Sequence, residues 1–128
     1  MQPLNLPHVV REVEAESARY ESALGSNDVA TLDALFWNSP LTIRYGLREN
    51  LYGFEQIADF RASVTEPGSG GKRRLKTVVT TFGEDMATVN TMFEREAAPQ
   101  RIGRQSQTWV RTPGGWRIVA AHVSIIDR

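Results

Sequence analysis

The sequence predicts an α+β fold in which a curved antiparallel sheet follows, and packs against, N-terminal helices. Two observations support this prediction. Apolar residues in the first half of the chain recur at helical intervals, whereas the second half contains four runs of strand-like residues. The 128 residues have the length of one domain and show no internal repeat, so residues 1–128 are expected to fold as one unit.

Three helices are expected in the first half. The first follows from Val10, Val13, Ser17, Tyr20 and Leu24 at helical spacing, with Gly25 placed to end it. Asn27 is expected to cap a second, short helix that ends before Pro40. A third helix is expected after Gly53, and short extended segments on either side of Gly46 precede it.

Four strands are expected in the second half, at residues 74–82, 86–96, 103–112 and 116–126. Turn residues at 83–85 and 113–115 indicate antiparallel hairpins between neighbours. The glycine-rich residues 66–72 precede the first of these strands and are expected to form a flexible loop, because they mark the change from helical to strand-like periodicity.

The composition excludes several classes of protein. Fifteen basic residues balance fifteen acidic ones, so neither nucleic acid nor an anionic membrane is expected as a partner. The absence of cysteine excludes disulfide scaffolds, thiolate metal sites and cysteine nucleophiles. The N-terminal residues have no signal-peptide pattern and no apolar run is long enough to span a membrane, so a cytoplasmic protein is expected.

Common catalytic motifs are not found. Residues 68–72 contain glycines and a lysine but lack the spacing of a phosphate-binding loop. The basic run at residues 72–76 is interpreted as a solvated strand edge. His8 and His122 are the only histidines and cannot form a histidine-rich metal site, and no Gly-x-Ser-x-Gly elbow is present.

Three residues are candidates for a site, but their pattern leaves their roles open. Tyr20 lies on the apolar stripe of the first helix, so it is either a structural tyrosine or a hydroxyl donor in a cavity. Strand alternation puts Arg44 on the same face as Thr42, and Arg61 lies in the third helix. Without a fold, both arginines are interpreted as exposed.

A resemblance to a known superfamily extends this interpretation. The residues that carry it are Tyr20-Glu21-Ser22-Ala23-Leu24, Asn27-Asp28-Val29, Ala34-Leu35-Phe36 and Gly53-Phe54-Glu55-Gln56-Ile57-Ala58-Asp59-Phe60. They resemble ketosteroid isomerase, and the whole chain resembles the SnoaL-like, nuclear-transport-factor-2-like (NTF2-like) proteins. The resemblance implies a cone-shaped curved sheet packed on the helices.

The same match implies a pocket. Tyr20 falls on the isomerase's oxyanion-hole tyrosine and Arg44 on its general-base aspartate. Phe36 and Arg61 fall on pocket tyrosines, and Thr108 falls near the second oxyanion-hole acid. Because an arginine replaces the carboxylate base, the match speaks against steroid isomerisation. Two arginines at pocket positions suit a small, doubly anionic ligand instead.

Further segments resemble the AtzH-like group over nearly the full length. They are Asn27-Asp28-Val29, Leu35-Phe36-Trp37-Asn38-Ser39-Pro40, Glu49-Asn50-Leu51-Tyr52-Gly53, Gly103-Arg104-Gln105-Ser106-Gln107-Thr108-Trp109-Val110-Arg111 and Trp116-Arg117-Ile118-Val119-Ala120-Ala121-His122-Val123-Ser124. This group is associated with cyanuric acid and oxalurate catabolism. One branch implies decarboxylation of urea-1,3-dicarboxylate, with Tyr20 and Arg44 in the places of its key residues.

The resemblance therefore implies a cofactor-independent decarboxylase of an N-carboxylated urea, with no metal. Tyr20 and Arg44 are the expected catalytic residues, and the expected substrate-binding residues are Phe36, Arg61, Ser106 and Thr108. Two alternatives stay open. The protein could be a non-catalytic ligand-binding or accessory subunit of an amidohydrolase, or an enzyme acting on an oxalurate-pathway compound.

A homodimer is also expected. The last two predicted strands carry Trp109, Trp116, Val119, Val123 and Ile125 on alternating faces, so both faces look apolar. The face away from the pocket is therefore expected to pair with a second subunit.

Overall fold

The computed structural model describes residues 1–64 and 71–128 and confirms the α+β prediction. The elements in chain order are α1 (Pro7–Ser26), α2 (Val29–Leu35), β1 (Ile43–Tyr45), β2 (Asn50–Tyr52), α3 (Phe54–Ser63), β3 (Lys72–Phe82), β4 (Met86–Arg95), β5 (Arg101–Thr112) and β6 (Gly115–Asp127). Each predicted helix and strand is present. The expected flexible loop at residues 66–72 lies, except for its last two residues, outside the described residues.

The end of α1 differs from the prediction. The helix continues past Gly25 to Ser26 and closes at Asn27, which takes the left-handed conformation with φ of 52°. Asparagine tolerates this conformation better than most residues, so Asn27 caps the end of α1 rather than the start of α2. Asp28 caps α2 instead, because its Oδ1 accepts a hydrogen bond of 3.2 Å from the Thr31 backbone N–H.

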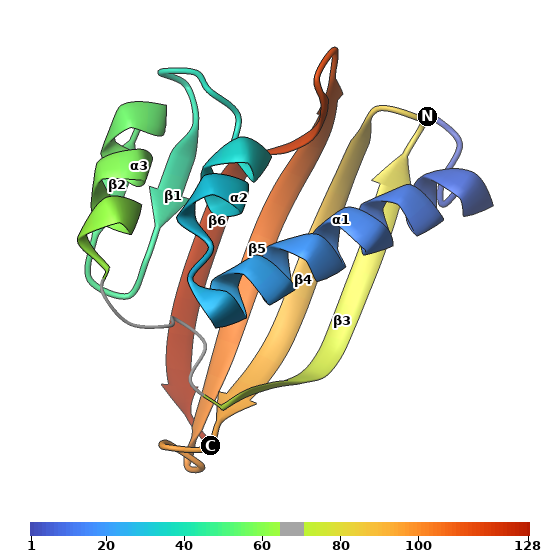
Figure 1. The fold of residues 1–128 in the computed structure, drawn as a ribbon. Coiled ribbons are helices and arrows are strands. Elements are labelled where there is room, and N and C mark those ends of the chain that lie inside the picture. Colours follow the sequence, from blue (N-terminus) through green and yellow to red (C-terminus); the bar gives the residue numbers. More distant parts are fainter. Residues whose placement is uncertain (65–70) are drawn as a thin grey trace.

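The six strands form one sheet in the order β2-β1-β6-β5-β4-β3 (Figure 1). Strands β3 to β6 pair as the predicted antiparallel hairpins. The sequence does not indicate where β1 pairs. It lies parallel to β6, with Arg44 opposite Ala121, and this pairing attaches the N-terminal half of the chain to the C-terminal strand.

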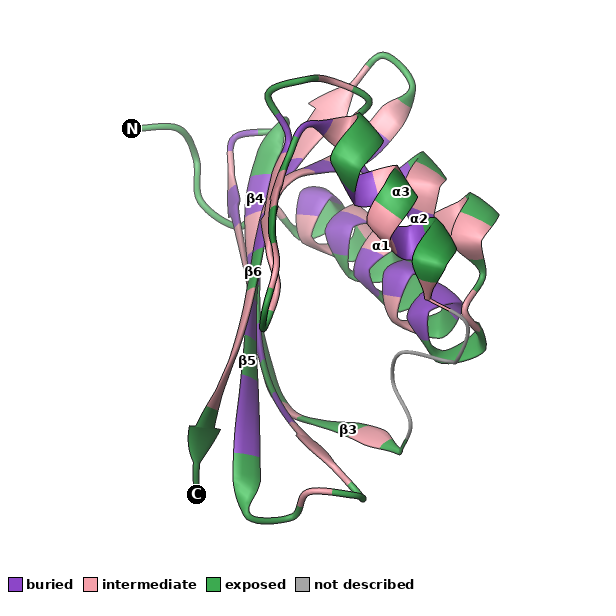
Figure 2. Ribbon diagram, turned by 90° about the vertical axis from the view of Figure 1, so that its left-hand side faces the viewer, coloured by how far each residue is buried: buried purple, intermediate pink, exposed green. Residues whose placement is uncertain are grey.

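The three helices cover one face of the sheet (Figure 2). The core lies between these layers, and its largest fully buried side chains include Val9, Val13, Leu32, Leu35, Ile57, Val89, Trp109 and Ile118. None of the helices among the described residues has the length and apolar content that a membrane span requires.

The opposite face of the sheet carries a mixture of apolar and polar side chains. Paired residues share a face, and one row across it consists of Val78, Asn90, Ser106, His122 and Tyr45. The two tryptophans expected to make both faces apolar lie among the buried core residues instead. The homodimer therefore stays a prediction, now with this mixed face as its proposed interface.

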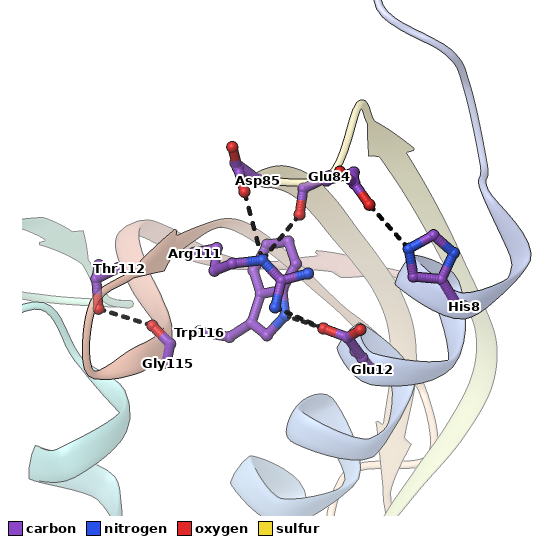
Figure 3. Close-up of polar contacts among 8 residues, drawn as sticks. All are labelled: His8, Glu12, Glu84, Asp85, Arg111, Thr112, Gly115 and Trp116. Carbon is purple, nitrogen blue, oxygen red and sulfur yellow. Dashed lines mark hydrogen bonds and ion pairs between the residues drawn. The ribbon is translucent and has the colours of Figure 1, made fainter.

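A polar cluster ties α1 to the ends of the hairpins (Figure 3). Trp116 donates a 3.0 Å hydrogen bond from Nε1 to Glu12, and Arg111 pairs with the same carboxylate oxygen at 2.7 Å. The Arg111 guanidinium also lies over the Trp116 ring, 4.7 Å from its centroid. These contacts join α1, β5 and β6 about two helical turns before Tyr20, and so fix the helix on the sheet.

The cluster generates a stability prediction. Hydrogen bonds from Trp116 and Arg111 hold the pKa of Glu12 below its usual range. A carboxyl with a lowered folded-state pKa contributes stability above its unfolded pKa and loses that contribution as the pH falls through the folded value. Because the Glu12 side chain is 40% exposed, Glu12→Gln should lower the free energy of unfolding by only about 0.5–1 kcal/mol at neutral pH.

Denaturant unfolding from neutral pH down to about pH 3 measures this effect, and the difference from wild type should shrink as Glu12 becomes protonated. Glu14→Gln is the matched control, since Glu14 is exposed on the same helix. Equal destabilisation by both variants, or a difference independent of pH, would contradict the prediction.

Candidate functional site

A cavity of about 400 Å³ lies between the C-terminal half of α1, α3 and the helix-facing side of the sheet. Its volume suits a small organic molecule. The residues that line it come from both halves of the chain: Tyr20, Leu24, Arg44, Leu47, Arg48, Glu49, Phe60, Arg61, Val64, Lys72, Phe93, Arg95, Gln105 and Val123. The structure therefore brings Tyr20, Arg44 and Arg61 together around one space.

Tyr20 reaches the cavity from the buried stripe of α1 and is 3% exposed. The Phe36 ring packs edge-on against it, with the ring centroids 6.3 Å apart. Burial raises the pKa of the Tyr20 phenol above its usual value, and the charges of Arg61 and Arg44 oppose part of that rise. The phenol is therefore neutral at physiological pH and can donate a hydrogen bond or a proton into the cavity.

Arg61 is buried in α3, with an exposed fraction of 4%, and is not the exposed arginine that the pattern indicates. Among the described residues, its Nη2 has no hydrogen-bond partner. Burial raises the pKa of Asp33 on α2, and the Arg61 charge opposes part of that rise. An unpartnered guanidinium nitrogen in a cavity wall is a ready donor to an anionic ligand. One feature of the sequence does indicate that Arg61 is buried, because Arg61 follows Phe54 and Ile57 at helical spacing and so lies on the same face of α3.

Arg44 points from β1 into the cavity and pairs with Glu49 at 2.9 Å. Its guanidinium lies over the Phe60 ring, 5.2 Å from the centroid. Gly46 allows the ion pair, because a Cβ at this position would collide with the Glu49 carboxylate and lie 3.0 Å from Arg44 Nη1. Arg44 is thus held in a defined orientation before any ligand binds.

Lys72, Gln105 and Glu21 form a second polar group at the cavity that the sequence did not indicate. Lys72 Nζ donates to Glu21 Oε1 at 2.7 Å, and Gln105 Nε2 donates to the other carboxylate oxygen at 3.2 Å. The Lys72 ammonium also lies 4.5 Å from the centroid of the Phe93 ring. The interpretation of the basic run at residues 72–76 as a solvated edge is wrong for Lys72, whose side chain is 4% exposed.

The other expected site residues lie elsewhere. Phe36 is buried behind Tyr20 and does not line the cavity. Ser106 and Thr108 lie on the face of β5 away from the helices, and Ser106 is exposed and hydrogen-bonds Asn90 at 2.6 Å. Strand alternation explains this placement, because Gln105 occupies the inward position next to Ser106.

The cavity is strongly cationic in a protein of zero formal charge. Of the residues that the structure describes, five with cationic side chains line it, namely Arg44, Arg48, Arg61, Lys72 and Arg95, and Glu49 is the one carboxylate. Among the described residues, no group of three or more acidic or histidine side chains could hold a metal ion. The side chains present can bind a small anion and supply a hydroxyl donor to it.

A second hollow is larger but chemically less suited to be the site. It has a volume of about 560 Å³ and lies between α1 and β3. Its charged residues, Glu14, Arg74 and Lys76, are exposed and therefore stay hydrated. The cavity next to Tyr20 combines buried charge with an aromatic wall, so it is the candidate site.

The fold defines the class of protein. The structure is similar to an NTF2-like superfamily protein from Salmonella enterica, with a TM-score of 0.70 and 26% sequence identity over 91% of this chain and 90% of that one. Helices packed on a curved, open sheet are the architecture of this fold. The protein therefore has the NTF2-like fold.

The chain belongs to the AtzH-like family, whose sequence pattern matches residues 2–128. A cystatin-like fold protein from Burkholderia xenovorans shares 45% identity, with a TM-score of 0.95, over 100% of this chain and 99% of that one. A protein of unknown function from Pectobacterium atrosepticum shares 50% identity, with a TM-score of 0.90, over 97% and 95%. No curated protein matches the chain.

The buried Arg61 generates a prediction that separates function from stability. Keeping a charge buried costs desolvation free energy, and replacing it by an apolar side chain of similar length removes this cost. Arg61→Met should therefore unfold at the wild-type temperature or above it. The same variant should lose at least about ten-fold in affinity for a small dicarboxylate such as malonate, because it lacks the unpartnered donor.

Thermal unfolding with and without malonate, together with calorimetric titration, measures both quantities. Arg11→Met removes the same charge from an exposed position of α1 and should bind malonate like wild type. Unchanged malonate affinity in a folded Arg61→Met variant would show that Arg61 does not bind the anion.

Proposed function

We propose that the protein is a cofactor-independent decarboxylase of a small N-carboxylated urea, such as urea-1,3-dicarboxylate. The observation that carries the proposal is the grouping of a buried neutral phenol with the buried Arg61 and the partly buried Arg44 in one small cationic cavity. Membership of the AtzH-like family and a fold class that includes enzymes support it. Carboxylates are the natural partners of arginine, which binds them with paired hydrogen bonds.

The reaction needs little beyond positioning and a proton donor. In an N-carboxylate the C–N bond breaks, the carboxylate leaves as CO2, and the bonding electron pair stays on the urea nitrogen and spreads onto the urea oxygen. One proton is then taken up, so the products are CO2 and the shortened urea. A donor to the urea oxygen or nitrogen stabilises the developing negative charge and accelerates the step.

Tyr20 is the proposed donor. Its phenol is neutral, buried and located beside Arg61, whose charge stabilises negative charge developing nearby. Arg44 and Arg61 orient the substrate, and the Glu49 partner keeps Arg44 in place. This use of fixed charges in a buried site requires no reorganisation during the reaction.

The cations also impose a constraint. A cation bound tightly to the departing carboxylate would stabilise the ground state, because that charge is lost in CO2. At least one cationic group must therefore bind the carboxylate that remains on the product. The charge of Arg44 is already offset by Glu49. This arginine can therefore contact the departing carboxylate and bind it less tightly than an arginine without an ion-pair partner would.

Tyr20→Phe tests the proposal most directly. It removes one hydroxyl and should lower kcat for CO2 release from urea-1,3-dicarboxylate by about 10²- to 10⁴-fold, with a smaller change in KM. Arg44→Ala should lower kcat/KM. Tyr45→Phe is the matched control, since the Tyr45 hydroxyl bonds Tyr52 on the opposite face of the sheet and should be dispensable.

Wild-type rates in a folded Tyr20→Phe variant would refute the role of Tyr20. A wild-type protein that releases no CO2 yet binds an amidohydrolase would favour the accessory-subunit alternative. Turnover of an oxalurate-pathway compound in its place would identify the other alternative.

The ionisation of Tyr20 generates a second prediction. Because burial raises the pKa of Tyr20 above the usual value of a phenol, the side chain stays protonated throughout the neutral and mildly alkaline range. The ratio of wild-type to Tyr20→Phe rates should then be constant between about pH 6 and about pH 9. Initial rates of CO2 release across this range measure the ratio, and a fall toward one by pH 9 would show that the tyrosine ionises earlier.

A further inference from the structure

Lys72 is an unusual residue for the position it occupies. The chain contains two lysines and thirteen arginines, and Lys72 is the lysine whose side chain is buried, with an exposed fraction of 4%. It lies at the start of β3 and lines the cavity. Burying an ammonium group costs free energy because the group loses its hydration. A position with a purely structural role would therefore favour an uncharged side chain.

The Lys72 ammonium has a charged partner in Glu21. Burial lowers the pKa of Lys72, and the Glu21 carboxylate offsets part of that lowering. Glu21 is held from its other oxygen by Gln105 and therefore cannot swing toward solvent without breaking that bond. Among the hydrogen bonds of the described residues, the Lys72 ammonium donates to Glu21, which occupies one of its three N–H groups. The others can serve a ligand in the cavity.

The sheet order places this ammonium across the cavity from Arg44. Strands β6, β5 and β4 lie between β1, which carries Arg44, and β3, which carries Lys72. Both side chains nevertheless line the same space, because the sheet curves around it. The Arg61 and Arg44 charges act on the Tyr20 phenol more strongly than the Glu21 carboxylate does, so the phenol belongs to the Arg44 side. The cavity thus has an arginine pole, with Arg44, Arg61 and the hydroxyl donor, and a lysine pole, where Lys72 lies opposite Arg95 of β4.

We propose that Lys72, held by Glu21 and Gln105, binds the carboxylate that remains on the substrate, so that the cavity selects linear dicarboxylates that span its two poles. This inference rests on the proposed function for the identity of the reacting end. The reacting N-carboxylate must lie at the arginine pole, because Tyr20 is there. The far carboxylate then lies at the lysine pole, where a strong ion pair does not oppose the loss of CO2.

Binding of stable analogues tests the inference without any reaction. Glutarate has two carboxylates separated by three atoms, as in urea-1,3-dicarboxylate, and its monomethyl ester has one carboxylate and nearly the same length. Wild type should prefer glutarate. Lys72→Met should lose about ten-fold or more of its glutarate affinity and bring the affinity ratio of the two compounds toward one. Lys72→Arg should restore part of the preference.

Lys76→Met is the matched control. It removes the other lysine from the same strand, at an exposed position outside the cavity lining, and should preserve the wild-type preference. An unchanged ratio in Lys72→Met, or no preference for glutarate in wild type, would overturn the inference.

Two further measurements keep the test decisive if Lys72→Met does not fold. The double variant Lys72→Met/Glu21→Gln removes both buried charges together, which costs less stability than removing one of them. In NMR spectra of wild-type protein labelled with ¹³C-lysine, glutarate should change the side-chain chemical shifts of Lys72 and leave those of Lys76 unchanged. Equal shifts, or none with glutarate bound, would contradict the assignment.

Kinetics then separate this inference from the proposed function. Lys72→Met should raise KM for urea-1,3-dicarboxylate about ten-fold or more with little change in kcat, since the contact is made equally in the ground and transition states. An increase in kcat would show that Lys72 binds the departing carboxylate and would overturn the inference. Absence of turnover in wild type would refute the decarboxylase, while the glutarate preference would still decide the role of Lys72.

Discussion

The parallel pairing of β1 with β6 is the contact on which the site depends. It involves three residues of β1, and it is continued by a backbone hydrogen bond of 3.0 Å from Trp37 to Ile118. Thr42 is fully buried next to β1 and donates a 2.7 Å hydrogen bond to the Trp37 carbonyl. The segment before β1 is therefore anchored along β6, and a shift of one residue would turn Arg44 out of the cavity.

Other parts of the site follow from this pairing. Strand β2 returns antiparallel to β1, and α3 begins two residues after it, so Phe60 and Arg61 are placed by the same attachment. The opposite wall comes from β3, β4 and β5, which pair by ordinary hairpins. Helix α1 crosses between these walls and contributes Tyr20 and Glu21 from adjacent positions, one to each polar group.

The charged residues of the cavity lower the stability of the fold, because burying a charge costs free energy. Arg61 and Lys72 are charged and buried, and the Arg61 Nη2 has no partner within the described part of the chain. The Glu21 carboxylate and the Phe93 ring offset part of the cost at Lys72, and the Glu49 carboxylate and the Phe60 ring do the same for Arg44. The apolar core and the Glu12 cluster stabilise α1 away from the cavity, so a destabilised site can be retained for binding.

The sequence by itself determined the elements and their order, because helical and strand periodicities are local properties. It placed Tyr20 on the buried stripe of α1 and identified the family, and a resemblance, rather than periodicity, selected Arg44 and Arg61.

The sequence could not determine which strand β1 joins, because that partner lies some 75 residues away along the chain. Nor could it determine that Ser106 and Thr108 face away from the cavity, or that Lys72 is buried against Glu21. Those outcomes depend on strand register and sheet curvature, which arise only when distant segments pack together. The equal numbers of acidic and basic residues can be counted in the sequence. The concentration of positive charge around one cavity is decided by the tertiary structure, which brings distant cationic residues together.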